Sequence, residues 1–200
     1  MLTFDEAAHI YRWHGAVVPN VTRVIGHLTD YSHIPPDVLR RAQEEGKAVH
    51  KMVELDCLGI LGVVPEWMRP HLEAWRKFLT ETGFEPLLSE HKAYHQALQY
   101  AGTLDLFGEF TKLKVKGAAL LDVKRSFLGG PTIGLQLSGY ELMLRADKAI
   151  PRVNFRAALR LCNDGKYAMK PYEDRDDEAA FLACLQQYRW KQKHYPTKEG

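Results

Sequence analysis

The sequence is short of the features that define several large classes of protein. It has three cysteines, Cys57, Cys162 and Cys184, which form no CxxC pair and offer no zinc or iron–sulfur ligand set. No run approaches the roughly 18 apolar residues of a membrane span, and the N-terminus lacks the basic-then-apolar layout of a secretory signal. These absences predict a cytoplasmic protein with reduced, buried thiols, no iron–sulfur cluster and no membrane partner.

The chain also lacks a strong net charge. Its formal net charge is +2, with 46% hydrophobic and 26% charged residues, the balance of an ordinary globular protein. No linker or repeat divides the 200 residues, so we expect a single domain over 1–200. Local basic clusters lie at 112–116, 152–160 and 189–198. Such clusters either bind phosphates or are simply solvated surface.

Hydrophobic periodicity predicts alternating helices and strands. Apolar residues recur at threes and fours in four segments, at about 37–58, 65–83, 131–147 and 176–194. Strand patterns cover 86–95, 102–111, 118–124, 152–162 and 166–171, the last two joined by an Asn-Asp-Gly turn. The sequence therefore predicts an α/β fold with a central mixed β-sheet flanked by helices.

The two central strands place charged side chains together. If they form a hairpin centred between Leu113 and Lys114, residues whose numbers sum to 227 pair, and Asp105 faces Asp122. Side chains alternate along a strand, so Lys124 shares the face of Asp122. The opposite face would be a core face made of Leu104, Leu106, Leu121 and Val123.

Two facing carboxylates repel each other, so the pair needs an explanation. A divalent cation is the natural one, because hard cations prefer carboxylate oxygens. Such an ion polarises a phosphoryl oxygen and lowers the pKa of bound water to about 7 in the best cases. Lys124 would then hold the hydroxide or offset charge on the phosphorane. The alternative is a solvated strand face with an Asp122–Lys124 salt bridge, at about 0.2–1 kcal/mol.

Several motifs follow one another along the chain. AGTLDLFGEF gives a small-residue approach to Asp105, and DVKRS carries an acidic residue, a spacer and a lysine, with Ser126 two residues on. LQLSGYELML spaces Gln136 and Tyr140 four residues apart, and EEGKAVHKMVE places His50 on an earlier helix. Taken in chain order, with the His50 helix first, the motifs resemble those of the PD-(D/E)XK nuclease superfamily, especially its RecB-like branch and related phage-type exonucleases.

This resemblance implies a restriction-endonuclease-like fold and Mg²⁺ or Mn²⁺ as the cofactor. The implied metal ligands are His50, Asp105, Asp122 and the main-chain carbonyl of Val123. Lys124 would position or activate water, while Gln136 and Tyr140 would orient the DNA strand.

Glu90 is a further candidate catalytic residue, because family members often carry a Glu on the strand before the first Asp. Its spacing is loose, and Glu109 competes for the role. Gly46 lies one helical turn before His50, so we expect that helix to approach the sheet closely there.

The resemblance implies a metal-dependent deoxyribonuclease, an exonuclease of phage-type recombination or repair, in a bacterial or phage-infected cell. DNA would be its substrate, and a recombination or single-strand-binding protein is the partner it suggests. Two alternatives stay open: a nucleic-acid-binding module with an inactive nuclease fold, and a phosphohydrolase of small nucleotides. The sequence leaves open exonuclease or endonuclease action, polarity, strand preference, DNA against RNA, and the oligomeric state.

Overall fold

A small N-terminal sheet precedes the main body of the protein. The computed structural model describes residues 1–115, 117–125, 130–147 and 149–195. The small sheet has the order β1-β2-β3, with β1 at Leu2–Asp5, β2 at Ile10–Trp13 and β3 at Ala16–Val18. Helix α1 (Val21–Ile25) and the 3₁₀ turn η1 (Gly26–Leu28) follow. The Asn20 side chain caps α1 by accepting the Arg23 N–H at 2.8 Å.

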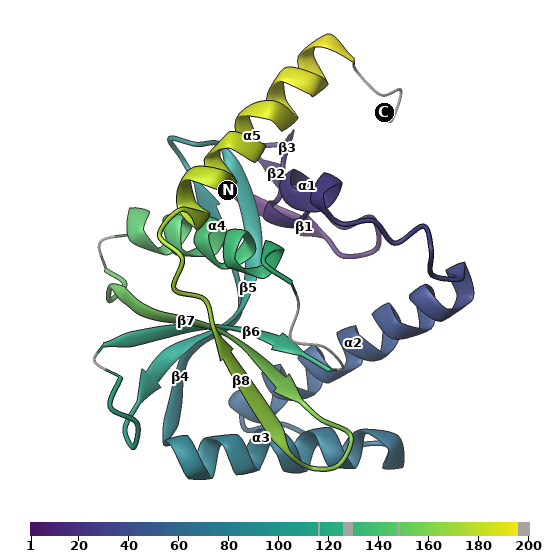
Figure 1. Cartoon of the computed structure of the whole chain (residues 1–200), viewed down its shortest axis with the longest axis vertical. Helices are drawn as coiled ribbons and strands as arrows, with labels where there is room; N and C mark the ends of the chain where they lie inside the picture. The colour runs from purple at the N-terminus through teal and green to yellow at the C-terminus, as the bar shows by residue number, and fades with distance from the viewer. Residues whose placement is uncertain (116, 126–129, 148, 196–200) are drawn as a thin grey trace.

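The central sheet has five strands in the order β4-β5-β6-β7-β8 (Figure 1). Their bounds are Phe84–His95 (β4), Tyr100–Phe110 (β5), Ala118–Lys124 (β6), Val153–Leu161 (β7) and Tyr167–Pro171 (β8). Strands β6 and β7 are parallel and the other neighbours antiparallel. Helix α4 (Thr132–Ala146) lies between β6 and β7 in the chain, as a parallel connection requires.

Helices cover both faces of this sheet. Helices α2 (Pro36–Cys57) and α3 (Arg69–Thr82), with the 3₁₀ turn η2 (Glu66–Met68) before α3, pack on one face around Trp75 and Phe78. Helices α1, α4 and α5 (Asp177–His194) pack on the other around Leu137 and Phe181. Helix α3 ends at Gly83, whose positive φ of 63° favours glycine. The structure thus confirms the predicted mixed α/β fold, consistent with the restriction-endonuclease-like kind.

The predicted hairpin register is confirmed, because Leu106 pairs with Leu121 and Glu109 with Ala118. The predicted single core face is wrong for one residue. Leu106, Leu121 and Val123 pack against α2 and α3, whereas Leu104 packs on the α4 side. The β5–β6 pairing ends at Leu106, so the simple alternation is not kept through Asp105.

The remaining sequence features fit this fold. Cys184 is buried, while Cys57 and Cys162 are half-buried, and all three are free thiols. Within the described part of the chain, no helix combines the length and the apolar character needed to cross a bilayer.

Candidate active site

The candidate site lies where β5 and β6 stop pairing. Just beyond the last pair, the Val123 N–H donates to Oδ2 of Asp105 at 2.6 Å. The aspartate side chain therefore accepts the hydrogen bond that a strand carbonyl would accept in a continuous ladder. Both carboxylates of the predicted pair are buried, with Asp105 9% and Asp122 1% exposed. Buried carboxylates need partners, and two groups of side chains provide them.

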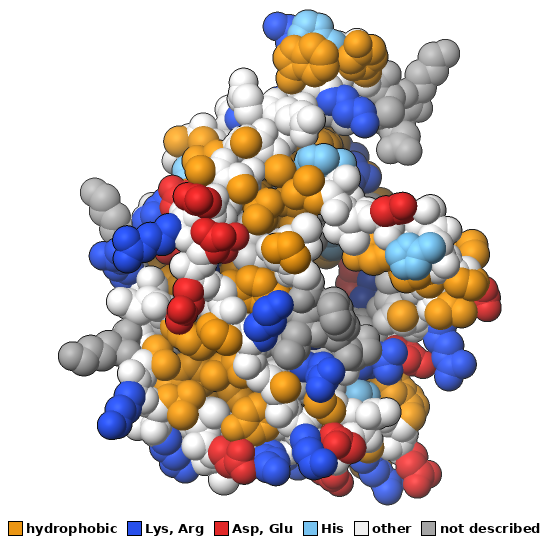
Figure 2. Space-filling model, in the orientation of Figure 1, with side chains coloured by type: hydrophobic (Ala, Val, Ile, Leu, Met, Phe, Trp, Pro, Cys, Tyr) orange, Lys and Arg blue, Asp and Glu red, His pale blue; other side chains and the backbone are white. Residues whose placement is uncertain are grey.

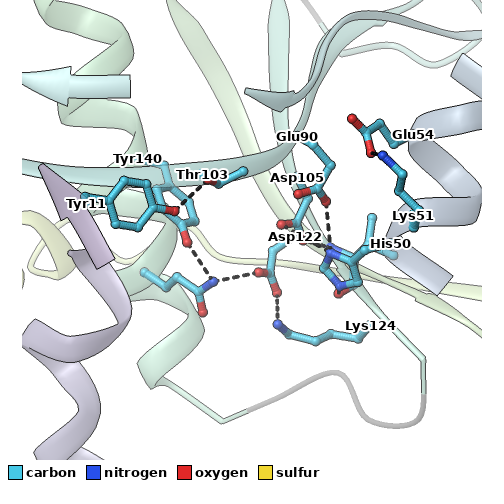
Figure 3. A network of polar contacts seen from close by, with 12 residues as sticks. Tyr11, His50, Lys51, Glu54, Glu90, Thr103, Asp105, Asp122, Lys124 and Tyr140 are labelled. Carbon is cyan, nitrogen blue, oxygen red and sulfur yellow. Dashed lines mark hydrogen bonds and ion pairs between the residues drawn. The ribbon is translucent and has the colours of Figure 1, made fainter. Parts of the chain in front are cut away.

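The first group is a cluster of possible metal ligands. Within the described residues, ligand atoms of His50 from α2, Glu90 from β4 and Asp105 from β5 all lie within 4.8 Å of one another (Figure 3). His50 Nδ1 is 3.2 Å from Glu90 Oε1 and 3.5 Å from Asp105 Oδ1. Glu90 has a φ of 46°, which is strained for a residue other than glycine. Backbone strain of this kind is common where a side chain is aimed for function.

Glu90 therefore joins the cluster, and its competitor does not. Glu109 is exposed at the other end of β5, where it pairs with Glu85 of β4 and Ala118 of β6.

The other nitrogen of His50 fixes the orientation of its ring. His50 Nε2 lies 2.9 Å from the Val123 carbonyl oxygen. A carbonyl only accepts, so Nε2 carries a proton and Nδ1 faces the carboxylates. This is the usual way that a metal-binding histidine is held by an outer partner. The Val123 carbonyl accepts this hydrogen bond from His50, and its role as a metal ligand stays a prediction.

The second group surrounds Asp122. Lys124 Nζ lies 2.7 Å from Asp122 Oδ2, and Gln136 Nε2 donates to Asp122 Oδ1 at 2.9 Å. The same Gln136 nitrogen donates to the Tyr140 hydroxyl at 3.3 Å. The Asp122–Lys124 salt bridge thus exists, but its carboxylate is buried rather than on a solvated face. Gln136 and Tyr140 share a face of α4 as predicted and both reach this group.

Burial and like charge shift the ionisation of the cluster. Burial, together with the Asp122 and Glu90 carboxylates, raises the pKa of Asp105 to about 7 in spite of His50. Burial disfavours the imidazolium of His50, but Asp105 and Glu90 outweigh it and raise the pKa of His50 to about 9. Without metal, His50 therefore holds a proton at neutral pH between the carboxylates.

Two neighbours of Asp122, Lys124 and Tyr140, keep their protons at neutral pH. Burial alone would lower the pKa of Lys124, but Asp122 and Asp105 outweigh it, so the pKa is raised and the ammonium persists. Burial also raises the pKa of Tyr140 well above its usual value, so its hydroxyl stays neutral. This side of the site presents a fixed cation beside a neutral hydroxyl.

Close packing positions Tyr140 and a second tyrosine. A Cβ at Gly102 would lie 2.8 Å from Tyr140 Cε1, so only glycine lets this ring lie against β5. The Tyr11 hydroxyl, from β2, lies 2.6 Å from Thr103 Oγ1, and burial together with Glu90 and Asp105 raises the pKa of Tyr11. Tyr11 was assigned no role from the sequence, because a single tyrosine in a short strand does not indicate that it reaches the site. Its burial becomes visible only in the structure.

One expectation near the site is wrong, and another concerns a residue outside the described part of the chain. The expected close approach at Gly46 is wrong, because a Cβ there would meet no atom within 4 Å. His50 reaches the cluster with its own side chain instead. Ser126 lies outside the described residues.

Arg156, the middle residue of the basic cluster at 152–160, is not free to bind phosphate. Arg156 is 12% exposed and pairs with Asp177 at 3.1 Å and Glu141 at 3.6 Å. Arg156 also donates to the Asp174 carbonyl at 3.0 Å and to the Ser138 hydroxyl. Its role is to join β7 to α4 and α5.

Comparison with known proteins gives weak similarities. Neither the known protein families nor the curated proteins match this sequence. The crystal structure of SSO0001 is 14% identical at a TM-score of 0.36, covering 61% of this chain, which spans 57% of that one. LHK-Exo in complex with dAMP is 14% identical at a TM-score of 0.40, covering 88% and 92% of the two chains.

A second structure of LHK-Exo, the alkaline exonuclease from Laribacter hongkongensis, is 13% identical at a TM-score of 0.35. The aligned region covers 87% of this chain and 90% of the LHK-Exo chain. At these values the similarities assign neither a family nor an activity to this chain.

Proposed function

We propose that this protein is a divalent-metal-dependent deoxyribonuclease of the PD-(D/E)XK type, with residues 1–200 forming one nuclease domain. The observation that carries the proposal is the cluster of His50, Glu90 and Asp105, whose ligand atoms lie within 4.8 Å of one another. Beside it, Lys124 is held at 2.7 Å from the buried Asp122. A cation-binding cluster next to a fixed ammonium suits hydrolysis of a phosphodiester.

The donor set fits a hard divalent ion. Two carboxylates and one imidazole suit Mn²⁺ well and Mg²⁺ acceptably. His50, Glu90 and Asp105 would hold the ion, with Asp122 close enough to raise the pKa of Asp105. A bound ion would polarise a phosphoryl oxygen and make water a better nucleophile at neutral pH.

The second group would act on the phosphate and the water. Lys124 keeps its proton, so it stabilises a hydroxide or the negative charge that grows on phosphorus, and does not act as a base. Gln136 holds Asp122 in place and reaches Tyr140, whose neutral hydroxyl can donate to a phosphate oxygen. The site thus separates metal binding from phosphate binding.

DNA is the proposed substrate, and cleavage from an end in phage-type recombination or repair is the proposed role. The test is a time course with Mg²⁺ or Mn²⁺ on end-labelled linear, nicked and closed circular DNA. We expect loss of label from linear DNA. Cleavage of closed circles would indicate an endonuclease, binding without cleavage an inactive module, and preferential hydrolysis of small nucleotides a phosphohydrolase.

The matched variants are Lys124→Ala and Lys166→Ala. Lys124 is the proposed catalytic lysine, whereas Lys166 is 72% exposed and pairs with Asp164. We expect only Lys124→Ala to lose cleavage while both keep the fold by circular dichroism. Equal activity of Lys124→Ala and the wild type would rule out the assignment.

A further inference from the structure

The C-terminal end of α5 is exposed on all sides. Figure 1 shows that this end of the helix extends beyond the rest of the protein. Residues 190–195 are all exposed, including Trp190 at 55% and Tyr195 at 63%. We call residues 189–195 the α5 arm. Because this end of the helix buries no face, Trp190 does not stabilise a hydrophobic core.

Basic charge is concentrated on the same arm. Its sequence is RWKQKHY, with three basic residues, two large aromatic residues, one histidine and no acidic residue. These three positive charges exceed the formal net charge of +2 of the whole chain. Figure 2 shows hydrophobic and basic side chains together at this tip.

The arm is fixed at its base and open at its tip. Arg189 donates to the Leu98 carbonyl in the turn between β4 and β5, so this arginine is structural. Among the described residues, Lys191 and Lys193 form no ion pair. The two lysines therefore point their charge at solvent or at a partner.

The aromatic rings of the arm pack on one another without becoming buried. The Trp190 ring lies 4.8 Å from His194 and 5.8 Å from Tyr195, at tilts of 39° and 57°. Such contacts hold the rings in place, as pairs one helical turn apart do. Both large rings nevertheless keep more than half of their surface exposed. This arrangement presents pre-positioned aromatic faces between cations.

We infer that the α5 arm is a second binding site, separate from the metal cluster, for single-stranded DNA. Aromatic faces stack on unpaired bases and lysines attract the phosphates, which is how sequence-independent single-strand binding works. The choice of DNA over another polyanion rests on the proposed function. An arm away from the active site would hold the strand that is not being cleaved, or its continuation.

The test measures binding with no cleavage, by anisotropy of a labelled single-stranded 20-mer in EDTA. Trp190→Ala should weaken binding at least about fivefold, the effect of losing one stacked base, and Trp190→Phe should retain most of the affinity. Changing Lys191 and Lys193 to Gln should lower the slope of log affinity against log salt by about 1.4. Trp67→Ala is the matched control, since Trp67 is 45% exposed on η2.

Two results would overturn the inference. One is unchanged affinity in Trp190→Ala, and the other is an equal loss in Trp67→Ala. If the affinity is unchanged, a smaller sedimentation coefficient for Trp190→Ala would make the arm an interface between copies of this chain. Lys124→Ala tests cleavage without touching the arm, so failure of the proposed function and failure of this inference are distinguishable.

Discussion

Two buried clusters of charged residues in this protein have different roles. At Arg156, one permanently charged cation lies among acceptors from α4, α5 and the loop before α5, including the Asp177 and Glu141 carboxylates. At the candidate active site, Glu90, Asp105 and Asp122 lie together, and burial with their repulsion raises the pKa of Asp105 to about 7. The contrast indicates that the first cluster stabilises the fold, whereas the second keeps several carboxylates together for a ligand.

The largest effect on stability is expected at Arg156. Arg156→Ala would leave the buried Asp177 and the half-buried Glu141 carboxylates without their cation. Removing one partner of a buried ion pair costs about 3–5 kcal/mol. Urea denaturation measures the loss in free energy of unfolding. A loss below about 1 kcal/mol would mean that the cluster does not stabilise the fold.

Removal of the charge at Asp122 should affect cleavage more than folding. Asp122→Asn keeps the shape and the Gln136 hydrogen bond, while it relieves repulsion with Asp105 and loses the contact with Lys124. We expect DNA cleavage to fall by at least about 100-fold. The free energy of unfolding should change less than in Arg156→Ala. Glu109→Gln, which removes an exposed carboxylate from β5, should leave both quantities unchanged.

Metal affinity should depend on pH at the active site. The pKa of His50 is raised to about 9, so below that pH a metal ion must displace its proton. Affinity should therefore rise up to about tenfold per pH unit from 7 to 9 and then level off. Below pH 7 the dependence should steepen, because Asp105 is protonated there as well. Calorimetric titration with Mg²⁺ measures this, and a flat profile between pH 7 and 9 would contradict it.

The smallest effect is expected from two glycines. Gly102→Ala would push a Cβ against Tyr140 and Met143, at a cost of about 1–3 kcal/mol for overpacking, with a several-fold loss of cleavage. Gly46→Ala meets open space and should raise stability by about 0.5–1 kcal/mol through helix propensity. Thermal unfolding of both variants measures the difference. A gain of stability in both variants would show that the Gly102 contact is unimportant.

The sequence predicted those features that follow from local periodicity. The hairpin register followed from the turn position and the alternation of charged and apolar residues, and Leu106 does pair with Leu121. Helix and strand limits were close because Pro36, Gly83 and the Asn-Asp-Gly turn mark them. Such signals act over a few residues, so a single sequence is enough to read them.

Features that depend on tertiary contacts could not be predicted. Glu90 was a candidate only through the family resemblance, and no spacing rule anticipates the φ of 46° that accompanies its place in the cluster. Leu104 changes side because β5 and β6 separate at Asp105. Arg156 appeared as a basic surface residue because its partners Glu141 and Asp177 come from two different regions of the chain.

The most direct test is equilibrium binding of Mn²⁺, followed by electron paramagnetic resonance, to the wild type and to Asp105→Asn and Glu109→Gln. If His50, Glu90 and Asp105 hold a divalent ion, the wild type and Glu109→Gln should bind with equal affinity. Asp105→Asn should bind at least about tenfold more weakly. Wild-type affinity in Asp105→Asn would contradict the account.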